Sequence, residues 1–212
     1  AGGTSICGAA AVMGLSGSMP VLPEEEDEKE QNEVMAVATV AIMGTIYALA
    51  EIFILPHFGM TNQQLGIASG ASLHEIAHAV AAGGAFNSIN VATIMKLSRV
   101  LMLVPASIFI AIWWNAHHSK VENGGKHKIS FPWFMLGFIA ASVIGTYVPF
   151  ITAHASTLVE AGYVFLGMAM AALGINVNFK VIFKQGRTAF LASFLASIVL
   201  VVLACLAAVL FF

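Results

Sequence analysis

Long apolar stretches constrain this chain more than any other feature of its sequence. Three of them are long enough to cross a lipid bilayer, because about 20 residues of helix suffice. They are Val34 to Pro56, Val91 to Asn115 and Thr188 to Phe212. Only 9% of the residues are charged, against about 25% in soluble domains. The sequence therefore predicts an all-α protein embedded in a membrane.

Two further apolar stretches predict additional membrane spans. Phe131 to Thr152 opens with the pair Pro132-Trp133, and tryptophan is typical of the membrane interface. Leu158 to Ile175 is rich in Gly, Ala and Met, which allows close helix packing. We therefore expect a polytopic fold with about five full spans.

Two segments predict helices that are interrupted inside the membrane. Ala1 to Met19 and Gly66 to Ala85 are rich in small residues and contain both glycines and polar side chains. Unwound backbone at membrane depth is tolerated only where it is buried in protein or lines a cavity. These two broken helices are therefore expected inside the protein.

The chain reads as a single membrane domain over residues 1–212, with an acidic linker at 20–33 between the broken helix 1–19 and the first full span 34–56. The linker contains Glu24-Glu25-Glu26-Asp27-Glu28, and a solvated, flexible connection is the simplest interpretation of such a run. Basic residues cluster in two later loops, which the positive-inside rule makes cytoplasmic. They are Lys120, Lys126, Lys128, Lys180, Lys184 and Arg187. The linker is then extracytoplasmic if 66–85 crosses fully, and cytoplasmic if that segment is re-entrant.

Composition removes several classes of partner and cofactor. The net charge of -2 gives no basic surface, so nucleic acid is not an expected partner. Cys7 and Cys205 form no metal motif and no disulfide framework. No cofactor motif is present, and the lipid bilayer is the expected surrounding. A homo-oligomer is compatible with the sequence.

His74-Glu75-Ile76-Ala77-His78 matches His-Glu-x-x-His and supports three interpretations. On one helix face, His74 and His78 would bind zinc while Glu75 activates water, which is the chemistry of a zinc peptidase. That reading needs a third ligand that the sequence does not indicate. Intramembrane ionisable groups equally mark a transport path, and they also occur as mutually satisfied polar groups in a helix contact. We favour a transport role, with His74, Glu75 and His78 as a titrating or cation-coupling group.

Two other groups of residues suit an anion. Thr4, Ser5, Cys7 and Gly8 place hydroxyls, a thiol and free backbone N–H groups at a predicted helix break, where a helix N-terminus attracts negative charge. Close packing of small residues explains the same pattern. Lys96 and Arg99 share one helix face; they either extend to the interface or supply positive charge near an anion.

Several blocks in this order resemble the YeiH-type family of bacterial inner-membrane proteins. The blocks are Thr4 to Val12, Val37 to Val40, Gly70 to Gly83, Lys96 to Val100 with Pro105, Pro132 to Phe134, and Ala169 to Gly174. The resemblance spans nearly the whole chain. It implies an architecture similar to inverted-repeat secondary transporters, with the two broken segments crossing near the membrane midplane.

The resemblance also implies a function, because the family is described as sulfate exporters. The chain departs from the family in having His78 where members carry Gln, and in a longer, more acidic segment from Met19 to Glu33. Members also have further helices before the first block, so we expect a C-terminal portion of a longer transporter. The resulting hypothesis is alternating-access transport of a small inorganic or organic anion such as sulfate, coupled to ions or protons, in the bacterial inner membrane. The alternative is an intramembrane zinc metallopeptidase.

Overall fold

The computed structural model describes residues 2–19, 21–117, 133–149, 151, 154–176 and 187–212, and these parts form helices without a strand. The basic loops used to predict orientation fall almost entirely outside these ranges, as do parts of the predicted span 131–152. The helices are α1 (Gly2–Ser5), α2 (Ala9–Ser16), η1 (Pro23–Glu25), α3 (Glu26–Ile54), η2 (Leu55–Phe58), α4 (Asn62–Ser72), α5 (Ile76–Ala85), α6 (Ile89–Leu101), α7 (Leu103–His117), α8 (Trp133–Tyr147), α10 (Ala155–Asn176) and α12 (Arg187–Phe211). The predicted all-α class is confirmed.

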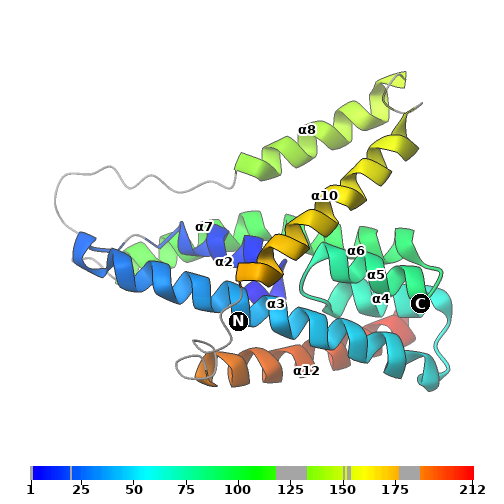
Figure 1. Cartoon of the computed structure of the whole chain (residues 1–212), viewed down its shortest axis with the longest axis horizontal. Helices are drawn as coiled ribbons and strands as arrows, with labels where there is room; N and C mark the ends of the chain where they lie inside the picture. Colours follow the sequence, from blue (N-terminus) through cyan, green and yellow to red (C-terminus); the bar gives the residue numbers. More distant parts are fainter. Residues whose placement is uncertain (1, 20, 118–132, 150, 152–153, 177–186) are drawn as a thin grey trace.

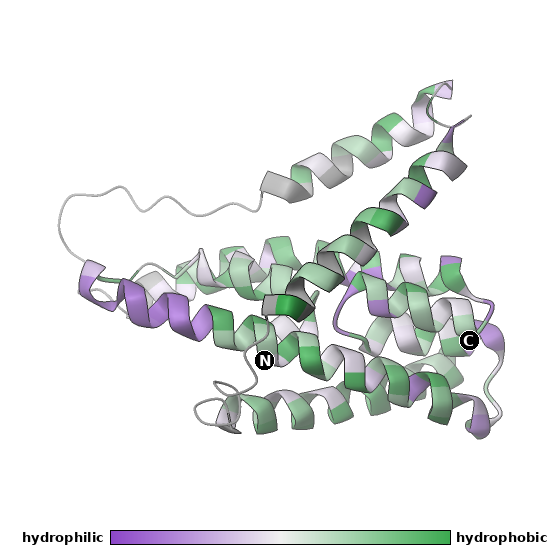
Figure 2. Ribbon diagram, viewed as in Figure 1, coloured by the Kyte–Doolittle hydropathy of each residue, from purple (hydrophilic) through white to green (hydrophobic). Residues whose placement is uncertain are grey.

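Helix α3 begins well before the predicted span. Residues 20–33 were expected to be a flexible linker, but η1 occupies Pro23–Glu25 and α3 is already helical at Glu26. Pro23 at the first helical position and Glu26, Asp27 and Glu28 in the first turn explain the difference. Proline is preorganised for a helix start, and acidic side chains complement the positive end of the helix dipole. The acidic run is thus the polar end of a long helix (Figure 2).

Both predicted broken helices are confirmed. The first divides into α1 and α2 around Gly8, and the second divides into α4 and α5 between Ser72 and Ile76. The second also starts earlier than expected, because Thr61 caps α4 through a reciprocal pair of hydrogen bonds with Gln64. Two interrupted helices of this kind lie inside one membrane protein.

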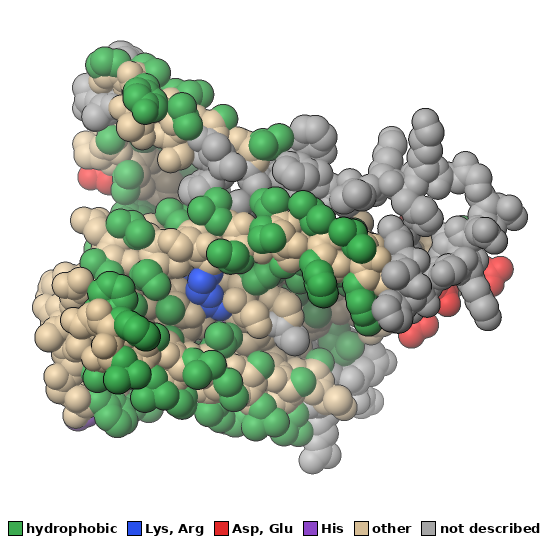
Figure 3. Space-filling model, turned by 180° about the vertical axis from the view of Figure 1, so that it is seen from behind, with side chains coloured by type: hydrophobic (Ala, Val, Ile, Leu, Met, Phe, Trp, Pro, Cys, Tyr) green, Lys and Arg blue, Asp and Glu red, His purple; other side chains and the backbone are tan. Residues whose placement is uncertain are grey.

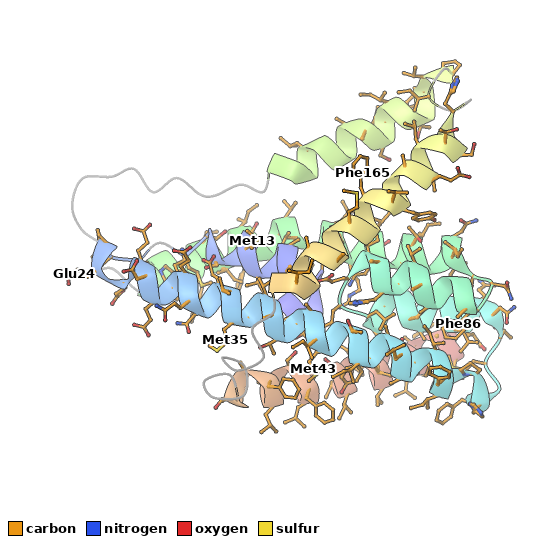
Figure 4. The ribbon with its side chains drawn as sticks, viewed as in Figure 1. Met13, Glu24, Met35, Met43, Phe86 and Phe165 are labelled. Carbon is orange, nitrogen blue, oxygen red and sulfur yellow. The ribbon has the colours of Figure 1, made fainter. Side chains whose placement is uncertain are left out.

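Helix α4 lies at the centre of the bundle, packed against α6, α5 and α12, while α3 crosses α2, α5 and α12 (Figure 1). The main apolar core forms where these helices meet. Met43 of α3 is 1% exposed in this core and lies beside α12 (Figure 4). The other fully enclosed members come from α4, α5, their connection and α12: Ala68, Leu73, Ala82 and Ala208.

Glycines bring α4 and α5 close to α6. A Cβ added to Gly70 would lie 2.9 Å from the Cβ of Met95 and 3.0 Å from the carbonyl carbon of Ala92. A Cβ added to Gly83 would lie 2.9 Å from the Cβ of Ala92. Small residues at such contacts allow helix backbones to approach where lipid gives no hydrophobic driving force. This tight contact fixes the position of α6, which carries Lys96 and Arg99.

Three helical stretches are long and apolar enough to cross a membrane: Pro23–Phe58, Ile89–Trp114 and Thr188–Phe211. The second comprises α6 and α7, which are interrupted at Met102. Apolar side chains cover much of the visible face of the molecule (Figure 3). Helices α8 and α10 project from the bundle in Figure 1, while α10 contacts α3 and α5. Apolar side chains of α10, including Phe165 at 69%, are exposed. These surfaces suit contact with lipid acyl chains.

Candidate functional site: the crossing of two broken helices

The two helix breaks touch each other. Gly8 has a φ of 66° and a ψ of -127°, a backbone conformation that L side chains rarely adopt. A Cβ at Gly8 would lie 2.6 Å from Cγ and 2.8 Å from Oε1 of Glu75, in the second break. Glycine is therefore required at this position both for the turn and for the contact. We call the region where Gly8 meets Glu75 the crossing.

Local geometry explains why each helix stops at the crossing. In the first break, the N–H of Gly8 donates to the carbonyl of Gly3 at 2.8 Å, which closes the turn after α1. In the second break, Leu73 and Glu75 are extended, with ψ values of 151° and 157°. Helix α5 then restarts at Ile76. Each break exposes one helix C-terminus and one helix N-terminus inside the protein.

Lys96 joins the C-terminal ends of α1 and α4, the half-helices that precede the two breaks. Its side chain is 0% exposed, and Nζ donates to the carbonyls of Ile6 at 2.9 Å and Leu73 at 2.5 Å. The last carbonyls of a helix have no intrahelical partner and carry the negative end of the helix dipole. An ammonium group donates hydrogen bonds to these carbonyls and offsets their negative charge. The alternative that Lys96 extends to the membrane interface is wrong for this buried side chain.

Arg99 completes the same arrangement one helical turn further along α6. Its guanidinium donates to carbonyls at the end of α1, those of Thr4 at 3.4 Å and Ser5 at 2.5 Å. It also donates to the carbonyls of Ala71 and Leu73 at the end of α4. The planar guanidinium has five N–H donors in fixed directions, which lets one side chain bridge both helix ends. Figure 3 shows a small patch in the colour of Lys and Arg amid apolar residues.

Glu75 lies at the opposite, positive side of the crossing. It is the N-cap residue of α5, but its side chain makes no capping bond to that helix. Its carboxylate instead lies beside Gly8 and interacts with the backbone of Ala9, the first residue of α2. Oε1 of Glu75 is buried and has no hydrogen-bond partner among the described residues. One carboxylate thus lies at the N-terminal ends of both half-helices.

The two histidines do not share one helix face, as the zinc interpretation required. Helix α5 begins at Ile76, so His74 precedes the helix while His78 lies within it. Nε2 of His74 hydrogen-bonds to Oγ of Ser197 at 2.9 Å on α12, and Nε2 of His78 lies 3.3 Å from Oγ1 of Thr45 on α3. Nδ1 of each ring is buried without a partner in the described part of the chain. The described residues contain no group of three His, Cys, Asp or Glu side chains suited to a metal ion.

The remaining predicted residues divide between the interior and the surface. Thr4 is 0% exposed and shares a 3.1 Å hydrogen bond with Ser193 of α12, so its hydroxyl is already engaged. Ser5 is exposed, and its carbonyl accepts from Arg99. Cys7 is partly buried, and its thiol lies at the backbone of Ala11 in α2.

Three buried polar partners lie outside the predicted site residues. Ser193 and Ser197 lie four residues apart on one face of α12, and Oγ of Ser197 donates to the carbonyl of Ser193. Glu51 of α3 is 3% exposed and accepts a 2.6 Å hydrogen bond from Ser72. The i,i+4 spacing of the two serines was the available signal, because it places both hydroxyls on the same side of an apolar helix.

A cavity of about 600 Å³ lies between α1, α2, the acidic end of α3 and α7, and neither Gly8 nor Glu75 lines it. Its lining includes Glu25, Glu28, Glu33 and Lys29. Lys29 is 3.9 Å from Glu33, which also accepts a hydrogen bond from Ser16. An excess of carboxylates repels anions, so this cavity is not an anion site.

The fold and the crossing together define an all-α membrane protein in which two interrupted helices meet at their breaks. Residues 1–193 match a family model described as conserved hypothetical protein 698, and the chain belongs to this family. A UPF0324 membrane protein of Bifidobacterium longum is 63% identical over 212 residues, covering 100% of this chain and 60% of the relative. The predicted family resemblance is confirmed.

Other relatives carry the same description. A UPF0324 membrane protein of Lactobacillus johnsonii is 50% identical, covering 99% of this chain and 62% of the relative. A UPF0324 membrane protein of Bacillus anthracis is 38% identical, covering 95% of this chain and 58% of the relative. The chain thus spans about three fifths of the length of the curated relatives it matches. No solved structure matches the chain.

Proposed function

We propose that this chain belongs to a multi-pass secondary transporter of the bacterial inner membrane, which moves a small inorganic or organic anion by alternating access. The observation that carries the proposal is the crossing, where two broken helices meet. Lys96 and Arg99 donate to the carbonyls at its C-terminal helix ends, and Glu75 lies beside Gly8 at the N-terminal end of α2. Broken helices that meet inside a membrane protein are typical of secondary-transporter sites, where half-helix ends face the substrate and the coupling ion. A purely structural contact has no need of this many buried ionisable groups, which are costly in a membrane.

The polarity of the crossing favours an anion over a cation. The carbonyl ends of α1 and α4, which would attract a metal cation, already receive the N–H groups of Lys96 and Arg99. The N-terminal ends of α2 and α5 present first-turn N–H groups, which lack intrahelical acceptors and carry partial positive charge. We place the anion at these N–H groups around Gly8. Thr4 does not supply its donor directly in this arrangement, because its hydroxyl is bonded to Ser193.

Coupling to protons or ions is assigned to the groups beside that position. His74, Glu75 and His78 are all buried, and each has one side-chain atom without a partner among the described residues. A buried group that gains and loses a proton as the site changes its exposure can link proton movement to anion movement. Thr45 and Ser197 hold the histidine rings in place.

Transport in proteoliposomes tests the proposal. We expect the purified chain, with the full-length Bifidobacterium longum relative alongside, to accumulate radioactive sulfate or another small anion when a pH or sodium gradient is imposed. Glu75→Gln is expected to make the flux insensitive to that gradient while anion exchange continues. Glu51→Gln is the matched control, because Glu51 is buried at Ser72 rather than at α2. Unchanged coupling in Glu75→Gln would contradict the assigned role, and no flux in either protein would contradict transport.

Zinc content separates this proposal from the peptidase alternative. We expect less than about 0.1 zinc per chain after mild chelator washing, because a structural or catalytic zinc site needs at least three protein ligands. Elemental mass spectrometry of wild type beside His78→Gln measures this directly. About one zinc per chain, lost in His78→Gln, would favour a metallopeptidase over a transporter.

A further inference from the structure

The carboxylate of Glu75 is held in an unusual position for a helix N-cap residue. The residue is 8% exposed and extended, and its own helix receives no side-chain capping bond. The carboxylate reaches across to the first residue of α2. Aspartate, asparagine, serine and threonine commonly cap their own helix through such a bond. Glu75 lacks this bond, and its carboxyl group lies at the N-terminus of another helix.

The same carboxylate is only partly satisfied. Oε1 is buried, faces the turn at Gly8 and has no partner within the described ranges. An ionised carboxylate has about four acceptor directions, so a buried one with an empty oxygen is poorly compensated. In a membrane interior no lipid group can supply the missing donor. This half-paired state is expected of a group that leaves its position during a working cycle.

We infer that the side chain of Glu75 occupies the position where the transported anion binds, so that the protein's own carboxylate and the substrate exclude each other. This inference rests on the proposed function and adds the order of events: the anion enters only when Glu75 leaves the N-terminus of α2. A small oxyanion resembles a carboxylate in its oxygen acceptors and its negative charge. Both therefore compete for the same N–H groups.

Steric fit supports mutual exclusion. The Glu75 side chain fills the space beside Gly8 so closely that an added Cβ would lie 2.6 Å from its Cγ. An anion at the first turn of α2 has no room while that side chain is in place. The fully enclosed Lys96 keeps the region electropositive after Glu75 departs, because its ammonium remains bonded to Ile6 and Leu73.

Glu51 provides an internal comparison. It is also buried, and its Oε2 lacks a partner among the described residues. Its other oxygen accepts from Ser72, the last residue of α4, so it lies at the carbonyl end of a half-helix. An anion gains nothing at that end, since the helix dipole is negative there. Removal of the Glu51 carboxyl group should therefore leave the N-termini of α2 and α5 as they are in the wild type.

The test is equilibrium binding of sulfate, chloride and acetate, each measured separately by calorimetry on the purified chain in detergent. Glu75→Ala and Glu75→Gln are expected to bind the preferred anion at least about threefold more tightly than wild type, because a resident negative charge at a helix N-terminus has been removed. Glu51→Gln is expected to match wild type. Glu75→Gln keeps the size of the side chain, so its circular dichroism and melting temperature show whether the fold is retained.

Equal or weaker anion binding in folded Glu75→Ala and Glu75→Gln, beside measurable binding in wild type, would overturn the inference and leave the anion transporter standing. The same tightening in Glu51→Gln would also overturn it, because the effect would then follow from the loss of any buried carboxyl group. Absence of binding in wild type and in every variant would overturn the inference together with the anion-transport proposal. The two failures are therefore distinguishable in one set of titrations.

Discussion

Replacing Lys96 with methionine is expected to lower the free energy of unfolding by about 2 to 4 kcal/mol. The substitution keeps an unbranched side chain of similar length but removes the donors to the carbonyls of Ile6 and Leu73. The carbonyl of Ile6 loses its Lys96 donor, which costs about 1 to 3 kcal/mol for a buried group. The carbonyl of Leu73 keeps only its 3.3 Å bond from Arg99, and the lost bond there adds about 1 kcal/mol. In a membrane interior water does not replace the lost donors. For a chain of this size, the melting temperature should fall by about 5 to 15 °C.

Thermal unfolding in detergent, followed by circular dichroism or by a thiol-reactive dye, measures the effect of Lys96→Met. Lys29→Met is the matched control, because Lys29 also donates to a main-chain carbonyl, that of Met19 at 3.0 Å, but lies partly exposed at the polar end of α3 in an i,i+4 pair with Glu33. Such pairs contribute about 0 to 1 kcal/mol, so the control should shift the melting temperature by no more than about 4 °C. A Lys96→Met protein as stable as the control would show that Lys96 does not hold the breaks together. In the proposed transporter, Lys96→Met is also expected to lose anion flux, because the two breaks lose one of the two cationic side chains that join them.

Gly70→Ala is expected to destabilise the protein by about 1 to 3 kcal/mol, the usual cost of overpacking a tight contact. The added methyl group would meet the backbone carbonyl of Ala92 and the Cβ of Met95, neither of which can rotate away. Helices α4 and α6 must then separate. Lys96 follows Met95 directly on α6, so the separation also draws its ammonium away from the break at Leu73.

Gly84→Ala is the matched control for Gly70→Ala. An added Cβ at Gly84 would lie 3.9 Å from the side chain of Ile89, which is an ordinary contact distance. Alanine favours the helix over glycine by about 1 kcal/mol, so this variant should be as stable as wild type or more stable. The melting temperature and the anion flux of both variants are the quantities to measure. Equal melting temperatures for Gly70→Ala and wild type would mean that α4 and α6 are not in tight contact.

Much of the fold was predictable because its signals are local. The apolar stretches predicted the helices now seen at α3, α6 with α7, and α12. Glycine within a small-residue run predicted the first break, where Gly8 adopts a positive φ. The acidic residues before Val34 misled the prediction because their charge suggested a solvated linker. They are equally favourable in the first turn of a helix, where they offset its dipole.

The candidate site was predictable by residue type but not by partner. Lys96, Arg99 and Glu75 were singled out because ionisable groups in apolar helices are rare and costly. The sequence did not show that Lys96 donates hydrogen bonds to main-chain carbonyls, because every residue has such a carbonyl and its position in space is not encoded locally. Nor did it show that His74 faces Ser197, a residue 123 positions away.

By itself, the sequence determined that this chain folds into helices within a membrane and where two of those helices break. Hydropathy and backbone freedom act over a few residues, so both can be read along the chain. Only the tertiary structure decided that the breaks meet, that their C-terminal ends share Lys96, and that Glu75 lies at the N-terminus of α2. Those contacts join segments 23 to 90 residues apart, and they exist because glycine-lined helices can approach closely enough for buried charges to find backbone partners.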